Sequence, residues 1–135
     1  MLQAAFGAGW LVRPQGPVAL DDESEPEPDV AVVSGDIDDY RLAHPARPVL
    51  AIEVAVSSLA LDRSHKASVY ARAGVADYWI VNLVDRVLEV HRDPAPDLEA
   101  PYGWAYASIE ILSGGAAIAP LAAPASPIAV TSLLP

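Results

Sequence analysis

The chain has 135 residues and a formal net charge of −10, from 8 basic and 18 acidic residues. This length is typical of one domain, and the content of 53% apolar residues indicates a folded globular protein. The lack of cysteine excludes disulfides, cysteine–zinc sites and thiol catalysis, and the acidic balance argues against a general nucleic-acid binder. With no signal-peptide pattern and no apolar run long enough to span a membrane, we expect a cytoplasmic protein.

The N-terminal part of the chain is predicted to form short strands joined by polar turns. Residues 1–9 resemble the last turn of a helix whose beginning is absent. We therefore expect a single domain, residues 1–135, that lacks the start of its N-terminal helix. The predicted strands are 10–12, 17–20 and 30–33, with an acidic, proline-containing connector at 21–27 and a loop at 36–48.

The strongest predicted strand is 49–56. Its large aliphatic residues alternate with smaller ones, so the face that carries Glu53 is lined mostly by small side chains. A carboxylate in the middle of a buried strand costs on the order of several kcal/mol unless a metal, a cation or hydrogen bonds compensate it. Glu53 is therefore a candidate functional residue.

A helix is predicted over residues 62–73, with Ser57, Ser58 and Asp62 available as caps and Gly74 as its C-terminal stop. The helical period places Lys66 on the face that is turned toward the sheet. That face contains Asp62, Lys66, Val69, Tyr70 and Ala73, whereas Ser64, Ser68 and Arg72 fall on the other.

The remaining segments read as strands. Residues 77–81 and 86–92 form a predicted hairpin around 82–85, and a proline-rich loop with Pro94, Pro96 and Pro101 follows. Later strands are expected at 106–112 and, as an edge strand in the Pro/Ala-rich tail, at 128–131. Strands, one central helix and further strands predict an α/β domain with a central mixed β-sheet.

Four segments in this order resemble a known nuclease group. They are residues 25–33 (EPEPDVAVV), 50–58 (LAIEVAVSS), 62–75 (DRSHKASVYARAGV) and 77–81 (DYWIV). Together they are similar to the PD-(D/E)XK nuclease superfamily, specifically to a large bacterial family of largely uncharacterised restriction-endonuclease-like proteins. The resemblance covers roughly residues 10–131. It implies a restriction-endonuclease-like α/β/α core and a magnesium-dependent phosphodiesterase site.

The resemblance assigns roles to individual residues. Asp29 matches the motif aspartate and Glu53 the motif glutamate. The lysine usually found two residues after the glutamate is replaced by Ala55, and the family supplies it from the following helix, where Lys66 matches. The implied site is Mg²⁺, or alternatively Mn²⁺, held by Asp29, Glu53 and the carbonyl of Val54, with Lys66 orienting water or stabilising charge.

Each candidate also has a structural interpretation. Asp29 follows a proline and could cap a turn, Glu53 and Lys66 could form a structural ion pair, and Lys66 could pair with Asp62 on the helix surface. Our leading hypothesis is a magnesium-dependent DNA endonuclease, expected as a homodimer because cutting two strands favours paired sites. The alternative is a catalytically inactive nuclease-fold protein that acts as an interaction module, which the negative charge favours.

Overall fold

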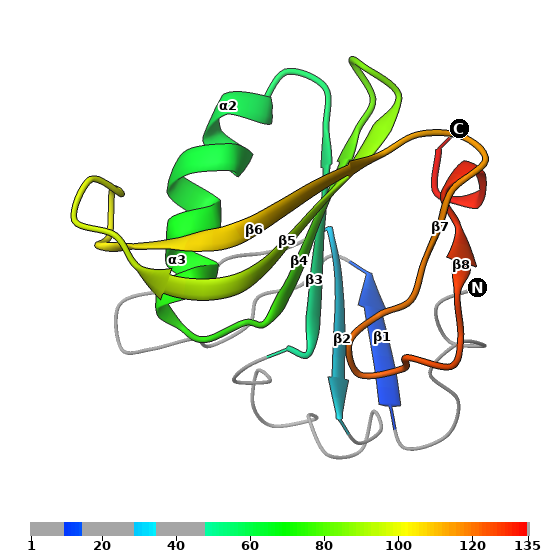
Figure 1. The fold of residues 1–135 in the computed structure, drawn as a ribbon, viewed down its shortest axis with the longest axis horizontal. Coiled ribbons are helices and arrows are strands. Elements are labelled where there is room, and N and C mark those ends of the chain that lie inside the picture. The colour runs from blue at the N-terminus through cyan, green and yellow to red at the C-terminus, as the bar shows by residue number, and fades with distance from the viewer. Residues whose placement is uncertain (1–9, 15–28, 35–47, 135) are drawn as a thin grey trace.

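A mixed sheet of six strands in sequential order organises the molecule, shown in Figure 1. The computed structural model describes residues 10–14, 29–34 and 48–134, so the expectations for 1–9, 17–20, 21–27 and 36–47 lie outside the described residues. The strands are β1 Trp10–Pro14, β2 Val30–Ser34, β3 Leu50–Ala55, β4 Asp77–Asn82, β5 Val87–Pro96 and β6 Trp104–Leu112.

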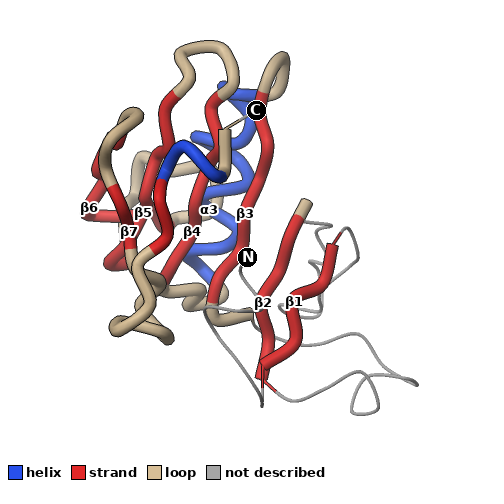
Figure 2. The backbone as a smooth tube through the Cα atoms, turned by 90° about the vertical axis from the view of Figure 1, so that its right-hand side faces the viewer, coloured by secondary structure: helices blue, strands red, loops and turns tan. Residues whose placement is uncertain are grey.

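The sheet is mixed because β3 and β4 are parallel, whereas all other neighbours are antiparallel. One helical segment connects β3 to β4 and packs on one face of the sheet (Figures 1 and 2). It consists of α2 Leu59–Leu61, the π-helical turn η2 Asp62–Lys66 and α3 Ala67–Arg72. The predicted α/β class with a mixed sheet is thus confirmed.

The helical segment begins earlier than predicted and ends as predicted. Ser58 takes the N-cap position, and Asp62 lies inside the helix rather than capping it. At the other end, Gly74 adopts φ 80°, its N–H bonds to the carbonyl of Ala71, and the N–H of Val75 bonds to that of Tyr70. This pair of bonds is the Schellman arrangement, which needs a left-handed residue and therefore favours glycine.

Two clusters of apolar side chains fill the two faces of the sheet. Under the helix, small and aromatic residues alternate, with Ala51, Ala55, Tyr70 and Tyr78 fully buried. Small residues on β3 let the helix approach the sheet closely. The opposite cluster is formed by aliphatic residues and Trp79, together with Ile128 and Val130 from the C-terminal segment.

The C-terminal segment covers the sheet face that lies opposite the helix. It contains β7 Ala117–Ile118, β8 Ile128–Ala129 and the 3-10 turn η3 Val130–Ser132. β8 pairs with β7 in a separate two-stranded sheet, so it is not an edge strand of the main sheet. Among the described residues, this segment stands where a second helical layer of an α/β/α core would lie. Pro120, Pro124 and Pro127 explain why it is not helical.

Two further predictions need correction. Pro94 and Pro96 belong to β5, where they pair with Tyr106 and Trp104 of β6. Proline is tolerated there because the pairing of β5 with β4 ends at Arg92, which leaves one side of β5 free of a ladder with β4. Ser68, expected on the outer face, is 1% exposed because the loop before β6 packs over it. Within the described segments, no helix is both long and apolar enough to cross a membrane.

Candidate active site

The first part of the site lies where the pairing of β2 with β3 ends. The β2–β3 ladder stops at Val30 and Ile52, so β3 continues past the start of β2. Asp29 continues the contact between the two chain segments beyond the end of the ladder. Its Oδ2 accepts a hydrogen bond from the N–H of Val54 at 2.6 Å, and its own N–H donates to Oε1 of Glu53 at 3.3 Å. Asp29 and Glu53 are therefore held side by side.

The carbonyl of Val54 faces the same open edge. In an extended strand, the N–H and C=O groups of one residue point to the same side. Because the N–H of Val54 points to Asp29, its carbonyl oxygen does as well. The next residue points the other way, and the carbonyl of Ala55 accepts the N–H of Leu83 on the β4 side at 3.0 Å.

Glu53 projects from β3 toward the helix and is 2% exposed. The hydroxyl of Tyr70 donates to its Oε1 at 3.4 Å, and the ammonium group of Lys66 forms an ion pair with its Oε2. Burial raises the pKa of the Glu53 carboxyl above its ordinary value, although the hydrogen bond and charge of Lys66 oppose this. Burial therefore disfavours the charged form of this carboxylate, and the Lys66 ammonium group favours it.

Lys66 is held between two buried carboxylates. Besides Glu53, its Nζ lies 3.2 Å from Oδ1 of Asp62, which is fully buried. Burial alone would lower the pKa of Lys66, but the hydrogen bonds and negative charges of Glu53 and Asp62 outweigh it and raise that pKa. The Lys66 side chain is 34% exposed, so a charged ammonium group reaches from the buried carboxylates to solvent.

The π-helical turn sets the position of Asp62 and Lys66. The Ser58 hydroxyl donates to Oδ2 of Asp62 at 2.9 Å, and the Tyr78 hydroxyl from β4 donates to the Asp62 carbonyl at 2.9 Å. Such turns occur often at functional sites, because one extra residue in the turn redirects the side chains around it. The sequence placed Asp62 on the sheet-facing side of the helix, in agreement with its burial, but identified it only as a cap or a surface partner of Lys66.

The three predicted residues Asp29, Glu53 and Lys66 therefore meet at one place, linked through Glu53. Ala55, which stands where the superfamily lysine is usual, is fully buried under the helix. Its small side chain allows the helix to bring Lys66 to Glu53. Tyr70 completes the contacts of Glu53 and was not singled out from the sequence.

The donor set at this edge fits magnesium. Mg²⁺ prefers oxygen ligands and keeps several waters, so two carboxylates and a main-chain carbonyl are sufficient. Asp29, Glu53 and Val54 supply these groups on one side of β3. In the part of the chain that is described, no three His, Cys, Asp or Glu side chains form a group that could hold a metal alone.

A second buried glutamate lies in the same row of the sheet. Glu53 pairs with Ile80 and Ile80 with Glu89, which is 1% exposed. Arg63 binds both carboxylate oxygens of Glu89, with Nε at 3.0 and 3.1 Å, and Asn82 Nδ2 donates at 3.0 Å. Burial would raise the pKa of Glu89, but these bonds and a contact with His91 lower it. The sequence signal, an acid inside a strand, was the same as for Glu53 and was overlooked.

The comparisons with known proteins agree with this architecture. A crystal structure described as "a putative nuclease belonging to DUF820 from Anabaena variabilis ATCC 29413" superposes with a TM-score of 0.64 at 12% sequence identity, over 93% of this chain and 68% of that chain. At this identity the match shows the fold. A search of curated proteins finds no match. The profile of the family described as "Uma2: Putative restriction endonuclease" matches residues 2–129, and the chain therefore belongs to this nuclease family.

Proposed function

We propose that this protein is a Mg²⁺-dependent DNA endonuclease of the PD-(D/E)XK type, with Mn²⁺ as an alternative metal. One observation carries the proposal: Asp29 before β2, Glu53 of β3 and Lys66 of the π-helical turn come together where the β2–β3 ladder ends. The raised pKa of this buried carboxylate, with Lys66 as a specific charge partner, also supports a functional site. Family membership supports the class of reaction.

In this proposal the metal is held by the carboxylates of Asp29 and Glu53 and by the carbonyl of Val54. A bound Mg²⁺ supplies Lewis-acid polarisation of the phosphoryl group. The hydrogen bond from Val54 N–H fixes the orientation of the Asp29 carboxylate, and Tyr70 fixes that of Glu53. The ligands are therefore set in place before substrate binds.

Lys66 acts in this proposal as a cation, not as a base. Its raised pKa keeps the ammonium group protonated at neutral pH, so it donates hydrogen bonds to a water or to a phosphoryl oxygen. Asp62 Oδ1 lies 3.2 Å from Nζ, and this second partner would keep Lys66 in the site if Glu53 engaged a metal. The role of Asp62 is thus to position Lys66.

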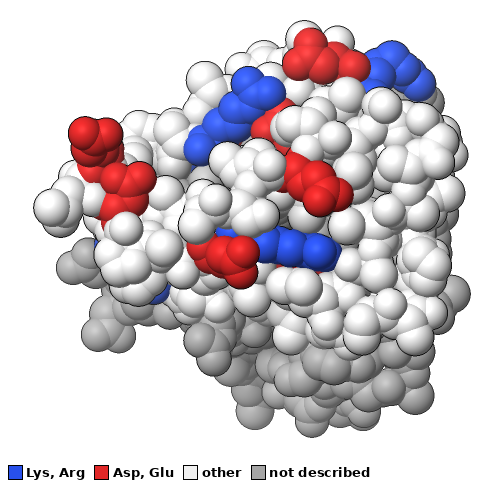
Figure 3. Space-filling view, in the orientation of Figure 1, with Lys and Arg blue, Asp and Glu red and all other residues white. Residues whose placement is uncertain are grey.

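The distribution of charged side chains limits how a polyanionic substrate could be held. Figure 3 shows basic and acidic side chains interspersed over one face, without a continuous basic stripe. A polyanionic substrate would therefore be held by local cations and by the metal, not by a general field. We also propose that the protein acts as a homodimer, which sedimentation of the purified chain would test.

The experiment that tests this function is cleavage of plasmid DNA by purified protein in Mg²⁺, in Mn²⁺ and in EDTA. Asp29→Asn and Glu53→Gln are expected to abolish cleavage, and Lys66→Ala to reduce turnover while metal binding persists. Arg86→Ala, an exposed residue on the β4–β5 turn, serves as a matched charge control. Metal binding without cleavage of any DNA or RNA would favour the interaction module, and cleavage by all three site variants would refute the assignment.

A further inference from the structure

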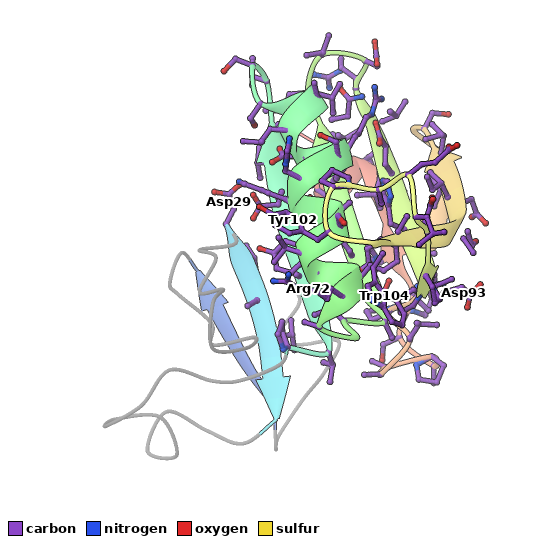
Figure 4. The ribbon with its side chains drawn as sticks, turned by 90° about the vertical axis from the view of Figure 1, so that its left-hand side faces the viewer. Asp29, Arg72, Asp93, Tyr102 and Trp104 are labelled. Carbon is purple, nitrogen blue, oxygen red and sulfur yellow. The ribbon has the colours of Figure 1, made fainter. Side chains whose placement is uncertain are left out.

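The loop between β5 and β6 packs across the outer side of the helical segment. It covers residues 97–103, and Figure 4 shows it passing over α3. The N–H of Tyr102 donates to the Ser68 hydroxyl at 2.9 Å, and that hydroxyl donates to the carbonyl of Trp104 at 2.6 Å. Ser68 is buried, so these bonds fasten the loop to the helix.

The loop is also braced internally. The N–H of Asp97 bonds to the carbonyl of Gly103 at 2.9 Å, and that of Gly103 bonds to the carbonyl of Ala100 at 3.1 Å. The Asp97 carboxylate accepts the N–H of Glu99 at 3.0 Å. A loop ordered in this way loses little conformational freedom when a ligand binds to it.

Tyr102 differs from the other tyrosines that face the helix. Tyr70, Tyr78 and Tyr106 are at most 7% exposed, whereas Tyr102 is 44% exposed. Its ring is nevertheless oriented: the Arg72 guanidinium carbon lies 5.0 Å from the ring centroid, and the His65 ring lies edge-on at 6.2 Å. An aromatic ring that is held in place and half open to solvent is a surface for stacking.

The surroundings of Tyr102 favour an anionic strand as the ligand. The same helix carries Arg63, Lys66 and Arg72, three of the eight basic residues in a chain of net charge −10. Arg63 and Lys66 are ion-paired with buried carboxylates, so Arg72 is the cation that lies over the ring. Figure 4 shows Asp29 and Tyr102 on the same side of the molecule, with Arg72 further along the helix. The ring of Tyr102 is thus in contact with the cation Arg72, and it faces the same side of the molecule as Asp29 in this view.

We propose that Tyr102, with Arg72 and His65, forms a stacking site for an unpaired nucleobase of the strand that enters the carboxylate site. This proposal rests on the proposed nuclease function and specifies its substrate as nucleic acid with a single-stranded segment. Aromatic side chains stack on any base, and an arginine beside the ring adds cation–π and phosphate contacts. Bases inside a duplex are already stacked, so an unpaired base is the one that gains from this ring.

The test is binding of a fluorescent single-stranded oligonucleotide and of its duplex, measured by anisotropy in EDTA so that cleavage does not interfere. Tyr102→Leu removes the ring and is expected to weaken single-strand binding by about 5- to 150-fold, with a smaller effect on the duplex. Tyr102→Phe keeps the ring and is expected to bind like the wild type. Leu98→Ala, a substitution in the same loop at a residue that is 99% exposed, is the matched control.

Thermal unfolding of each variant separates lost stacking from a loosened loop. Equal single-strand affinity of Tyr102→Leu and the wild type would overturn the stacking site. Equal losses in Tyr102→Phe and Tyr102→Leu would also overturn it, because they would point to the hydroxyl and not to the ring. If the wild type binds neither oligonucleotide, in EDTA or with Mg²⁺, the nucleic-acid substrate fails together with this proposal. DNA cleavage unaffected by Tyr102→Leu leaves the nuclease function standing.

Discussion

Glu53 and Glu89 allow a direct comparison of the carboxylate that we propose as functional with a second buried carboxylate. Both are buried, both lie on the helix-facing side of the sheet, and each is ion-paired with a cation from the helix. Their pKa values move in opposite directions, upward for Glu53 and downward for Glu89. We expect the substitution of each glutamate by glutamine, which keeps the shape and removes the charge, to have different effects on stability.

The cost of Glu89→Gln follows from its contacts. The substitution breaks the two-oxygen contact with Arg63 and turns an amide N–H₂ toward the donors of Arg63 or Asn82. Breaking a buried ion pair costs about 3–5 kcal/mol when a charge is left buried. The Arg63 side chain is 47% exposed and can turn to water, which reduces the loss. We expect about 2 kcal/mol of lost stability, since hydrogen bonds to charged groups contribute about 1.5–3 kcal/mol.

Glu53→Gln is expected to change stability by less than about 1 kcal/mol, because the relief of a buried charge offsets the lost pairing with Lys66. Lys66 is one-third exposed and keeps Asp62 as a partner, so it is not left alone. The raised pKa of Glu53 determines whether stability rises or falls with pH. Above the unfolded value, the folded protein still holds a proton that the unfolded chain has released, so wild-type stability falls as pH rises through this window. Glu53→Gln should remove that part of the slope.

The assay is urea unfolding, followed by tryptophan fluorescence, to which the fully buried Trp79 contributes, and by circular dichroism, over a series of pH values. A parallel series with Mg²⁺ should raise the midpoint of the wild type and of Glu89→Gln, but not that of Glu53→Gln. If Glu53→Gln loses as much stability as Glu89→Gln, and Mg²⁺ has no effect on either, then Glu53 and Lys66 form a structural pair and this reasoning is wrong.

Three further predictions concern the site and its support. Mg²⁺ affinity, measured by calorimetry, should increase with pH because the metal must displace the proton that the raised pKa retains on Glu53, and an affinity independent of pH would contradict Glu53 as a ligand. Ala55→Lys, which returns the lysine to its common superfamily position, should lower stability by more than about 2 kcal/mol because Ala55 is fully buried under the helix, and a stable, active variant would refute the packing argument. Gly74→Ala should lower stability by about 1 kcal/mol because of the φ of 80°, and thermal unfolding with Ala73→Gly as a control would show whether the left-handed turn is needed.

Much of the sheet could be predicted from the sequence, because strand periodicity is local. The predicted strands 30–33, 77–81 and 106–112 overlap β2, β4 and β6 closely. The nuclease resemblance indicated Asp29, Glu53 and Lys66, and the structure brings them together. Their roles in metal binding and catalysis remain predictions.

The π-helical turn and the pairing of Arg63 with Glu89 could not be predicted. A single inserted residue in a helix leaves little trace in periodicity and depends on contacts such as that of Tyr78 with the Asp62 carbonyl. Arg63 and Glu89 are 26 residues apart, and no local pattern joins them. The burial of Ser68 likewise depends on a loop that returns to the helix 34 residues later.

The C-terminal segment has a consequence for synthesis of the protein. Among the described residues, Ile128 and Val130 complete the apolar layer on the sheet face away from the helix, and they are synthesised after all six strands of the sheet. The antiparallel run from β4 to β6 is formed by neighbouring segments and can pair early. Trp79 and its aliphatic neighbours, however, gain their contacts with the C-terminal segment only after residues 116–134 have emerged. Nascent chains arrested before Ile128 should therefore recruit chaperones that recognise apolar surface, and released full-length chains should not.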